Sequence, residues 1–249
     1  MQDARPPSPR RTRWLPVVLG RLLLVAVMGL ALLAGLVWAR VVVLPGRFDP
    51  FAPLVVAEPP SWLTRFKLSR LREDGPQCLA VLDEAPVTFT PVADRETGQG
   101  CGFENAVEVT RSTVAFSRSF TASCPLAVAW SLFEAYVLQQ AARHHLGREV
   151  AQVRHFGTYA CRNVNHRPEG RRSQHATANA IDVAGFVLDD GSEVSLAGDW
   201  DGPDPRRRAF LRALRDGACR FFNVVLSPDF NEAHRDHFHL DMGRFRTCR

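Results

Sequence analysis

Beyond residue 40 the sequence lacks any surplus of positive charge. The 249 residues include 31 Lys and Arg and 26 Asp and Glu; residues 1–40 hold six of the bases and one of the acids, which leaves 25 of each for the rest. A nucleic-acid-binding domain concentrates basic residues on its own surface. This balance therefore argues against nucleic acid as a partner of the folded part of the chain.

Other absences narrow the function further. The sequence contains no internal repeat, no low-complexity array, no P-loop, no dinucleotide-binding glycine pattern and no G-x-S-x-G sequence around a serine. These patterns mark nucleotide-dependent enzymes and serine hydrolases, so both classes are disfavoured. The cysteines include no C-x-x-C pair, which makes a zinc–thiolate site a weaker hypothesis than disulfide bonds.

A long apolar stretch is present near the N-terminus. Residues 22–39 are uncharged and lie between Arg21 and Arg40. This length reaches the lower limit for a membrane-spanning helix, and residues 14–20 extend it. The basic residues before it place the N-terminus in the cytoplasm. We therefore expect a basic cytoplasmic tail over 1–13, a signal-anchor in the inner membrane over 14–44, and a periplasmic remainder. A signal peptide cleaved after Ala39, giving a secreted form, is the alternative.

The remainder divides into a linker and one domain. Five prolines between Pro45 and Pro60 predict an extended tether over 45–74, with a short helix or further linker at 65–72. Residues 75–249 are enough for one compact domain. Its six cysteines predict disulfides in an oxidising compartment. Sequence does not choose among the connectivities, and nearest-neighbour pairing is our hypothesis: Cys78–Cys101, Cys124–Cys161 and Cys219–Cys248.

Helix and strand patterns mix without a strict β-α-β order, which predicts the α+β class. Ser123, followed by Pro125, predicts a helix that ends near Gly147, and Asp204 with Pro205 predicts a second helix. The region 78–121 reads as β-rich. Its segment 106–116 fits a hairpin or two short strands, and further strands are expected at 149–155, 180–187, 193–196, 223–226 and around Phe238.

Two short stretches, 173–182 and 234–239, hold four of the eight histidines. If Phe238 lies mid-strand, alternation places His237, His239 and Asp241 on one face. His175 and Asp182 would complete a divalent metal site. The remaining histidines are interpreted as surface or core residues: His144, His145, His155 and His166.

These stretches resemble two motifs of the LAS peptidases. Ser173-x-His175-x-x-Ala178-x-Ala180-x-Asp182 resembles S-x-H-x-x-G-x-A-x-D, and His234-x-x-His237-x-His239 resembles the second motif of the D-Ala-D-Ala carboxypeptidase and penicillin-insensitive murein endopeptidase branches. Together with Tyr159-x-Cys161-Arg162 and the Cys219 helix, they resemble the bacterial extensin-like C-terminal domain family over about 75–249. Ala178 replaces the motif glycine; a left-handed backbone there would cost roughly 1 kcal/mol.

The resemblance implies a single LAS/hedgehog-like domain whose central, mostly antiparallel sheet is flanked by helices. It implies one Zn²⁺ per chain on His175, Asp182 and His239, with His237 as general base. His234 would polarise the carbonyl or orient the base, and Arg162 would stabilise the oxyanion. Ser173 is expected to hydrogen-bond locally, while Asp236 and Asp241 would fix histidine tautomers.

The expected function is a zinc-dependent peptidase or amidase that acts on peptidoglycan stem peptides or cross-links. A non-catalytic zinc-containing module that binds the cell wall or a partner is the alternative. A metal-dependent hydrolase of another periplasmic substrate, such as a glycan, is a third hypothesis. The sequence carries no indication of the oligomeric state.

Overall fold

The computed structural model describes residues 14–39 and 41–249. The predicted cytoplasmic tail, 1–13, lies outside the described residues. The chain separates into two units, one ending at Pro45 and one spanning Gly46–Arg249. The first unit contains helix α1, Trp14–Trp38, whose residues from Pro16 onward are long and apolar enough to cross a membrane. A signal sequence meets the same criteria.

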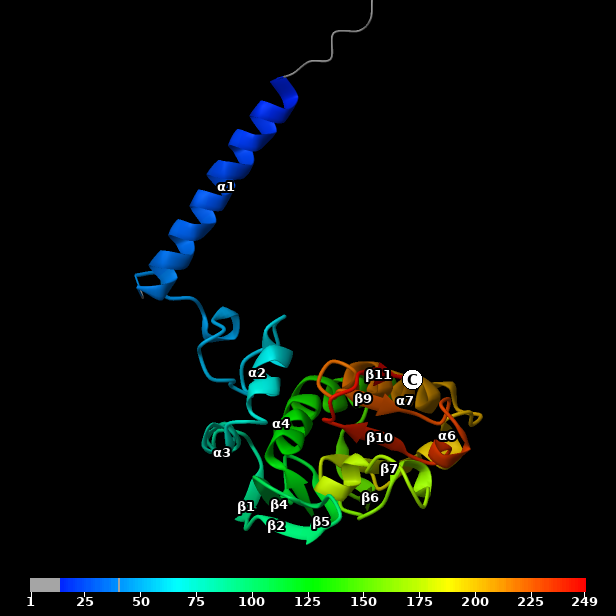
Figure 1. Ribbon diagram of the computed structural model, residues 1–249. Coiled ribbons are helices and arrows are strands. Elements are labelled where there is room, and N and C mark those ends of the chain that lie inside the picture. Colours follow the sequence, from blue (N-terminus) through cyan, green and yellow to red (C-terminus); the bar gives the residue numbers. More distant parts are fainter. Residues whose placement is uncertain (1–13, 40) are drawn as a thin grey trace, which may run out of the picture. The chain divides into compact units, whose positions relative to one another are not determined.

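The second unit is a mixed α/β domain (Figure 1). Its helices are α2 (Thr64–Arg70), α3 (Gly75–Asp83), α4 (Cys124–Phe133), the π-helical η2 (Glu134–Leu138), α5 (Gln139–Leu146), α6 (Leu196–Asp199) and α7 (Pro205–Ala218). The 3-10 turns are η1 (Gly46–Phe48), η3 (Val164–His166), η4 (Gln174–Thr177) and η5 (Glu232–His234). The strands are β1 (Thr88–Val92), β2 (Arg95–Gly98), β3 (Cys101–Phe103), β4 (Ala106–Arg111), β5 (Ala115–Ser123), β6 (Val150–Gly157), β7 (Ala180–Leu188), β8 (Glu193–Ser195), β9 (Val224–Leu226), β10 (Phe238–Asp241) and β11 (Thr247–Cys248).

Within the described residues, one nine-stranded sheet runs in the order β1-β4-β5-β6-β7-β10-β9-β11, with β8 paired to β7. Its pairs are antiparallel except β5–β6 and β9–β11. Strands β2 and β3 form a separate hairpin. The expected mostly antiparallel sheet flanked by helices is therefore present, and β7 lies near its centre.

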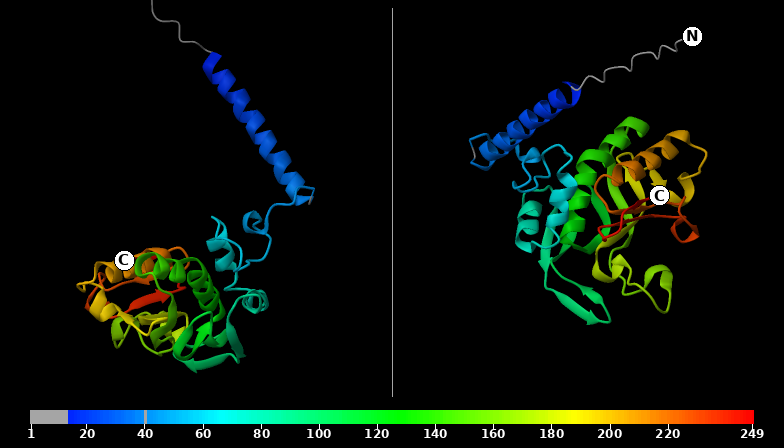
Figure 2. Two further views of the ribbon diagram at one scale, coloured as in Figure 1. Left: turned by 180° about the vertical axis from the view of Figure 1, so that it is seen from behind. Right: turned by 45° about the horizontal axis from the view of Figure 1, so that its top comes forward.

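Helices α4, α5 and α7 lie together on one face of this sheet (Figure 2). Ile181 and Val183 of β7, with Phe238 and Leu240 of β10, belong to the buried apolar core on that face. Since side chains alternate along a strand, Asp182 and the polar residues of β10 point to the other face. The helix-covered face supplies the core, and the opposite face is left for polar chemistry.

The predicted helix between Ser123 and Gly147 is observed as α4, η2 and α5 in succession. Gly147 ends it with a left-handed backbone, φ 65°, that glycine adopts without steric cost. Ser123 occupies the N-cap position, yet its hydroxyl makes no capping bond. It donates instead to Asn179 Oδ1 at 2.7 Å. Asp204 does cap α7, by accepting from the Arg206 amide.

Residues 45–74 differ from the predicted extended tether. From Gly46 onward they belong to the compact unit, and four apolar side chains from this segment are buried in its core: Leu54, Val56, Leu68 and Leu71. The Tyr136 hydroxyl also donates to the Val56 carbonyl at 3.0 Å. The prolines between Pro45 and Pro60 do accompany little regular secondary structure, but the apolar residues among them pack against the core of the domain.

Two of the three predicted disulfides are wrong. The structure pairs Cys78 with Cys124 and Cys101 with Cys161, while the predicted Cys219–Cys248 bond is present. Cys78 lies in α3, a helix within the region predicted to be β-rich, and α3 packs against the start of α4. Proximity in sequence is therefore a poor guide here, because helix packing and the β2–β3 hairpin determine which cysteines meet.

Candidate metal centre

Two residues of the candidate site are brought together by strand register. In the antiparallel pair β7–β10, His239 lies directly opposite Asp182. Both side chains point away from the helix-covered core, because their neighbours Ile181 and Leu240 are buried in it. His239 Nδ1 and Asp182 Oδ1 are 2.9 Å apart. The sheet itself thus holds an imidazole beside a carboxylate.

His175 comes from the loop between β6 and β7. It lies in the short turn η4, where the Ser173 hydroxyl accepts a hydrogen bond from the His175 amide at 3.3 Å. The turn ends at Ala178, which is fully buried and left-handed, with φ 51°. The position that is glycine in the LAS-type motif therefore has the backbone that favours glycine, and alanine adopts it under strain.

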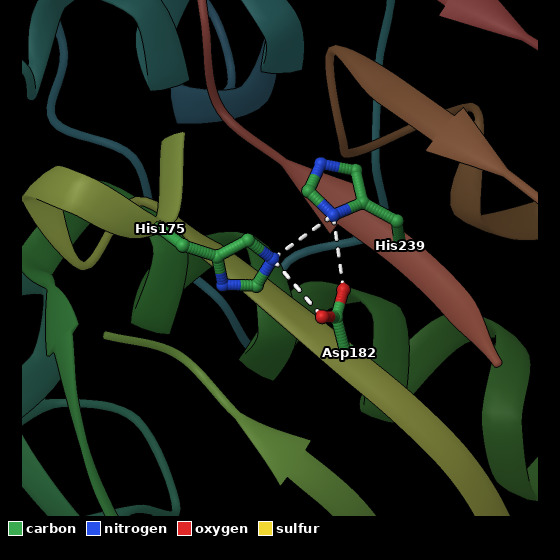
Figure 3. Close-up of side chains that lie close together, drawn as sticks. All are labelled: His175, Asp182 and His239. Atoms are coloured by element: carbon green, nitrogen blue, oxygen red, sulfur yellow. Dashed lines mark hydrogen bonds and ion pairs between the residues drawn. The ribbon is translucent and has the colours of Figure 1, made fainter. Parts of the chain in front are cut away.

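The three side chains converge on one point (Figure 3). His175 Nε2 lies 3.1 Å from Asp182 Oδ2 and 3.1 Å from His239 Nδ1. One donor atom from each residue lies within 4.8 Å of the other two, and all three residues are buried or nearly so. Two imidazole nitrogens and a carboxylate oxygen at such separations suit a single divalent cation.

Outer partners decide which nitrogen of each ring faces this point. The Thr158 carbonyl lies 3.0 Å from His175 Nδ1, and a carbonyl can only accept, so Nδ1 carries the proton and Nε2 faces inward. Asp241 Oδ2 lies 3.1 Å from His239 Nε2 and likewise fixes that ring with Nδ1 inward. Such carboxylate and carbonyl partners are the usual support of metal-binding histidines.

Two further histidines flank the three converging side chains. His237 precedes β10 directly; its Nδ1 donates to Asp236 Oδ1 at 2.9 Å, and its Nε2 lies 3.6 Å from Asp182 Oδ1. His234 Nδ1 donates to Asn231 Oδ1 at 2.7 Å. The ring centroids of His234 and His237 are 5.3 Å apart.

Arg162 and an adjoining cavity complete the surroundings. The guanidinium Nη2 of Arg162 lies 3.9 Å from Asp182 Oδ2. A cavity of about 380 Å³ opens beside the site. Its lining includes two of the three converging residues, Asp182 and His239, together with Arg162, His234 and His237. The chemistry-bearing groups therefore surround a space that can admit part of a substrate.

Charge coupling inside this site is strong. Burial alone would raise the pKa of Asp182, but hydrogen bonds from His175 and His239 hold it well below its usual range. Burial lowers the pKa of His239, while Asp182 and Asp241 outweigh this and raise it to about 9. Burial, followed by the neighbouring His239 and His237, lowers the pKa of His234 to about 4. His234 is thus neutral at physiological pH.

The predicted site residues that contact Asp182 in the structure are His175, His237, His239 and Arg162. Ser173, Asp236 and Asp241 contact His175, His237 and His239 respectively, and His234 lies beside His237. Sequence reasoning missed Thr158 and Asn231, which orient His175 and His234. Thr158 acts through a backbone carbonyl, so its side-chain identity gives no signal. Asn231, three residues before His234, leaves only a weak local signal. His155, interpreted as surface or core, is buried between Phe116 and Phe120.

Comparison with known families finds one match. The family model described as extensin-like protein C-terminus matches residues 76–249. The chain belongs to this extensin-like family. No curated protein and no solved structure matches it. The matched range of the extensin-like domain contains the whole site and all three disulfides.

Proposed function

We propose that the extensin-like domain is a zinc-dependent hydrolase of amide bonds in peptidoglycan stem peptides or cross-links. The observation that carries this proposal is that one nitrogen of each imidazole converges on the Asp182 carboxylate while the other is held by an outer acceptor, the Thr158 carbonyl for His175 and Asp241 for His239. The set His175, Asp182 and His239 fits one Zn²⁺ and leaves a fourth position for water or substrate. The LAS-type motifs in the same residues support the reaction class, and with it a LAS/hedgehog-like relationship of the fold.

A zinc ion held there would polarise a carbonyl and lower the pKa of water towards about 7. His237 is positioned to take the proton: Asp236 holds its Nδ1–H, so Nε2 presents a lone pair on the side of Asp182. The same nitrogen then returns the proton to the leaving amine. The Phe156 ring, 5.6 Å from His237, limits the directions in which the imidazole can turn.

His234 and Arg162 have separate roles in this proposal. A neutral His234 whose Nδ1–H is given to Asn231 has no Nε2–H to donate, so we assign it to orienting His237 rather than to polarising a carbonyl. Arg162 reaches the rim of the site with a permanent positive charge. It is placed to stabilise negative charge that develops on a carbonyl oxygen.

The compartment is also part of the proposal. We assign α1 as an uncleaved anchor in the inner membrane, with the extensin-like domain in the periplasm, where disulfides form and peptidoglycan is present. The balanced charge beyond residue 40 argues against nucleic acid in this setting.

The first experiment is metal analysis of the full-length chain in detergent, beside His175→Ala and His237→Ala. We expect about one zinc per chain, lost in His175→Ala and retained in His237→Ala. The zinc-loaded proteins are then incubated with purified sacculi, and released muropeptides are separated by chromatography. New cleavage products from the wild type, absent with His237→Ala, would support the proposal. Zinc without cleavage would favour a non-catalytic module, and a metal-free wild type after zinc supplementation would refute the hydrolase assignment.

A further inference from the structure

A second, larger cleft adjoins the metal cavity. Its volume is about 900 Å³, against about 380 Å³ for the cavity beside the site. The two share four lining residues, which therefore form their common border: Arg171, Gln174, Gly243 and Phe245. The two spaces are neighbours, so a long ligand can extend from the metal centre into the cleft.

One wall of the cleft is the β2–β3 hairpin, which is fastened to the site loop. Cys101 of β3 is bonded to Cys161, next to Arg162. At the hairpin tip, Arg172 Nε donates to the Gln99 carbonyl at 2.7 Å. This hairpin is outside the main sheet, yet it is tied covalently to the segment that carries the site. The attachment keeps the cleft wall at a constant position relative to the metal centre.

The floor contains a directed chain of hydrogen bonds. The Ser123 hydroxyl donates to Asn179 Oδ1 at 2.7 Å, and Asn179 Nδ2 donates to Gln174 Oε1 at 2.6 Å. This arrangement orients the Gln174 amide with its NH₂ group turned away from the chain. No acceptor for that NH₂ group occurs among the residues that the structure describes. Gln174 therefore presents two free donors at the border of the two spaces.

Gly243 makes room for this side chain. A Cβ at position 243 would lie 2.9 Å from Gln174 Cδ, closer than such contacts occur. The glycine lets Gln174 lie across the backbone between the cavity and the cleft. The position of the Gln174 amide is therefore determined both by its packing against Gly243 and by its hydrogen bond from Asn179.

The cleft also carries charges of both signs. Arg95, Arg244, Glu96 and Glu104 line it, and in the described part of the chain they form no ion pair or side-chain hydrogen bond with protein. A neutral sugar chain would leave all four charges without partners. A peptide that bears both carboxylate and ammonium groups can pair with both signs, while its backbone carbonyls accept from Gln174.

We propose that this cleft binds the part of a zwitterionic peptide that extends beyond the reacting bond, and that Gln174 is its positioning residue. The proposal rests on the hydrolase function, whose reacting group would lie at His175, Asp182 and His239. It adds the substrate chemistry: a peptide segment with free charged groups, long enough to span cavity and cleft. A dipeptide at the metal centre alone would gain nothing from the cleft.

The test uses Gln174→Glu in the full-length chain. Glutamate keeps the acceptor oxygen for Asn179 but replaces the donor NH₂ with a carboxylate oxygen. The matched control is Gln140→Glu, the same change at an exposed position on α5. Calorimetry measures binding of the stem tetrapeptide L-Ala–γ-D-Glu–diaminopimelate–D-Ala to each zinc-loaded protein in the His237→Ala background. Loss of a donor to bound peptide predicts about tenfold or greater weakening for Gln174→Glu and none for the control.

Arg244→Glu gives a second measurement that does not depend on the folding of the Gln174 variant. Reversing this exposed charge should weaken the tetrapeptide several-fold and leave a dipeptide unaffected. Unchanged tetrapeptide affinity in both variants, or no binding of tetrapeptide to the parent protein, would overturn the cleft assignment even if sacculi are cleaved. Binding that both variants weaken, with no cleavage by the wild type, would support the cleft and refute the hydrolase function.

Discussion

Asp241→Asn is the change that best separates a metal centre from a polar cluster. Asp241 accepts twice: Oδ2 from His239 Nε2 at 3.1 Å and Oδ1 from the Gly243 amide at 2.7 Å. Asparagine has one acceptor oxygen, so one of these donors loses its partner. The orientation and tautomer of the His239 ring are then less well determined, and its Nδ1, which faces the site, becomes a poorer metal ligand.

The size of the effect follows from the role of the carboxylate. Replacing such a partner of a metal-binding histidine costs about 10- to 100-fold in metal affinity, or about 1.4–2.7 kcal/mol. Asp241 is buried, at 5 % exposed, so little solvent is available to replace the lost bond. The zinc affinity of Asp241→Asn should therefore fall within this range, while the protein stays folded.

The measurement is competition for zinc against a chromophoric chelator of known affinity. Asp236→Asn is the matched control, because Asp236 supports His237, which is not among the three converging residues. We expect Asp236→Asn to keep wild-type zinc affinity and to lose cleavage activity. Equal zinc affinity in wild type and Asp241→Asn, or equal losses in both variants, would refute the reasoning.

Three further predictions concern stability, measured by urea unfolding of chelator-treated protein. Burial, and after it the nearby Arg118 charge, lowers the pKa of His155 below 6.5, although the hydrogen bond from His155 to the Arg118 carbonyl raises it. As the pH falls through 6.5, the unfolded chain therefore takes up a proton at His155 before the folded chain does, and the free energy of unfolding decreases. His155→Gln should make this decrease with falling pH smaller. Ala178→Gly would relieve about 1–2 kcal/mol of left-handed backbone strain, but it also removes a buried methyl group and increases the entropy of the unfolded chain. These effects offset one another, so Ala178→Gly should change the free energy of unfolding by less than about 1 kcal/mol, whereas Ala178→Val should lower it by more than that. Replacing Cys101 and Cys161 by serine opens a loop with a separation of 60 residues, which predicts a loss of about 4 kcal/mol, and peptide mapping without reductant should recover that linkage. A decrease in the free energy of unfolding that matches a short loop, or a recovered peptide in which Cys78 is linked to Cys101, would contradict the structure.

Local patterns predicted most elements of the domain. Ser123-Cys-Pro125 and Asp204-Pro205 marked helix starts, since proline is tolerated only in the first turn and polar residues precede it. The strand at 180–187 followed from an apolar run bounded by turn residues and is observed as β7. Helix α3 was missed although Asp74 and Pro76 mark its start in the same way, because residues 78–121 were interpreted together as β-rich.

The histidine motifs identified the members of the site, because spacing along one strand determines which side chains share its face. His239 and Asp241 could therefore be paired before the fold was known. The direction of each ring was not predictable, since it depends on partners as remote as Thr158 for His175. That Gln174 lines a second cleft was likewise not predictable, because residues far apart in the chain form that cleft.

What the sequence by itself determined is local: charge distribution, the apolar helix, the helix starts, and the motif residues that carry the proposed chemistry. These features depend on neighbours within a few residues, where steric and hydrogen-bonding rules act directly. Only the tertiary structure decided the disulfide partners, the packing of residues 46–74 and the contact of His175 with the β7–β10 pair. Each of these joins segments far apart in the chain, so its free energy depends on how the whole sheet and its helices pack, which no local pattern encodes.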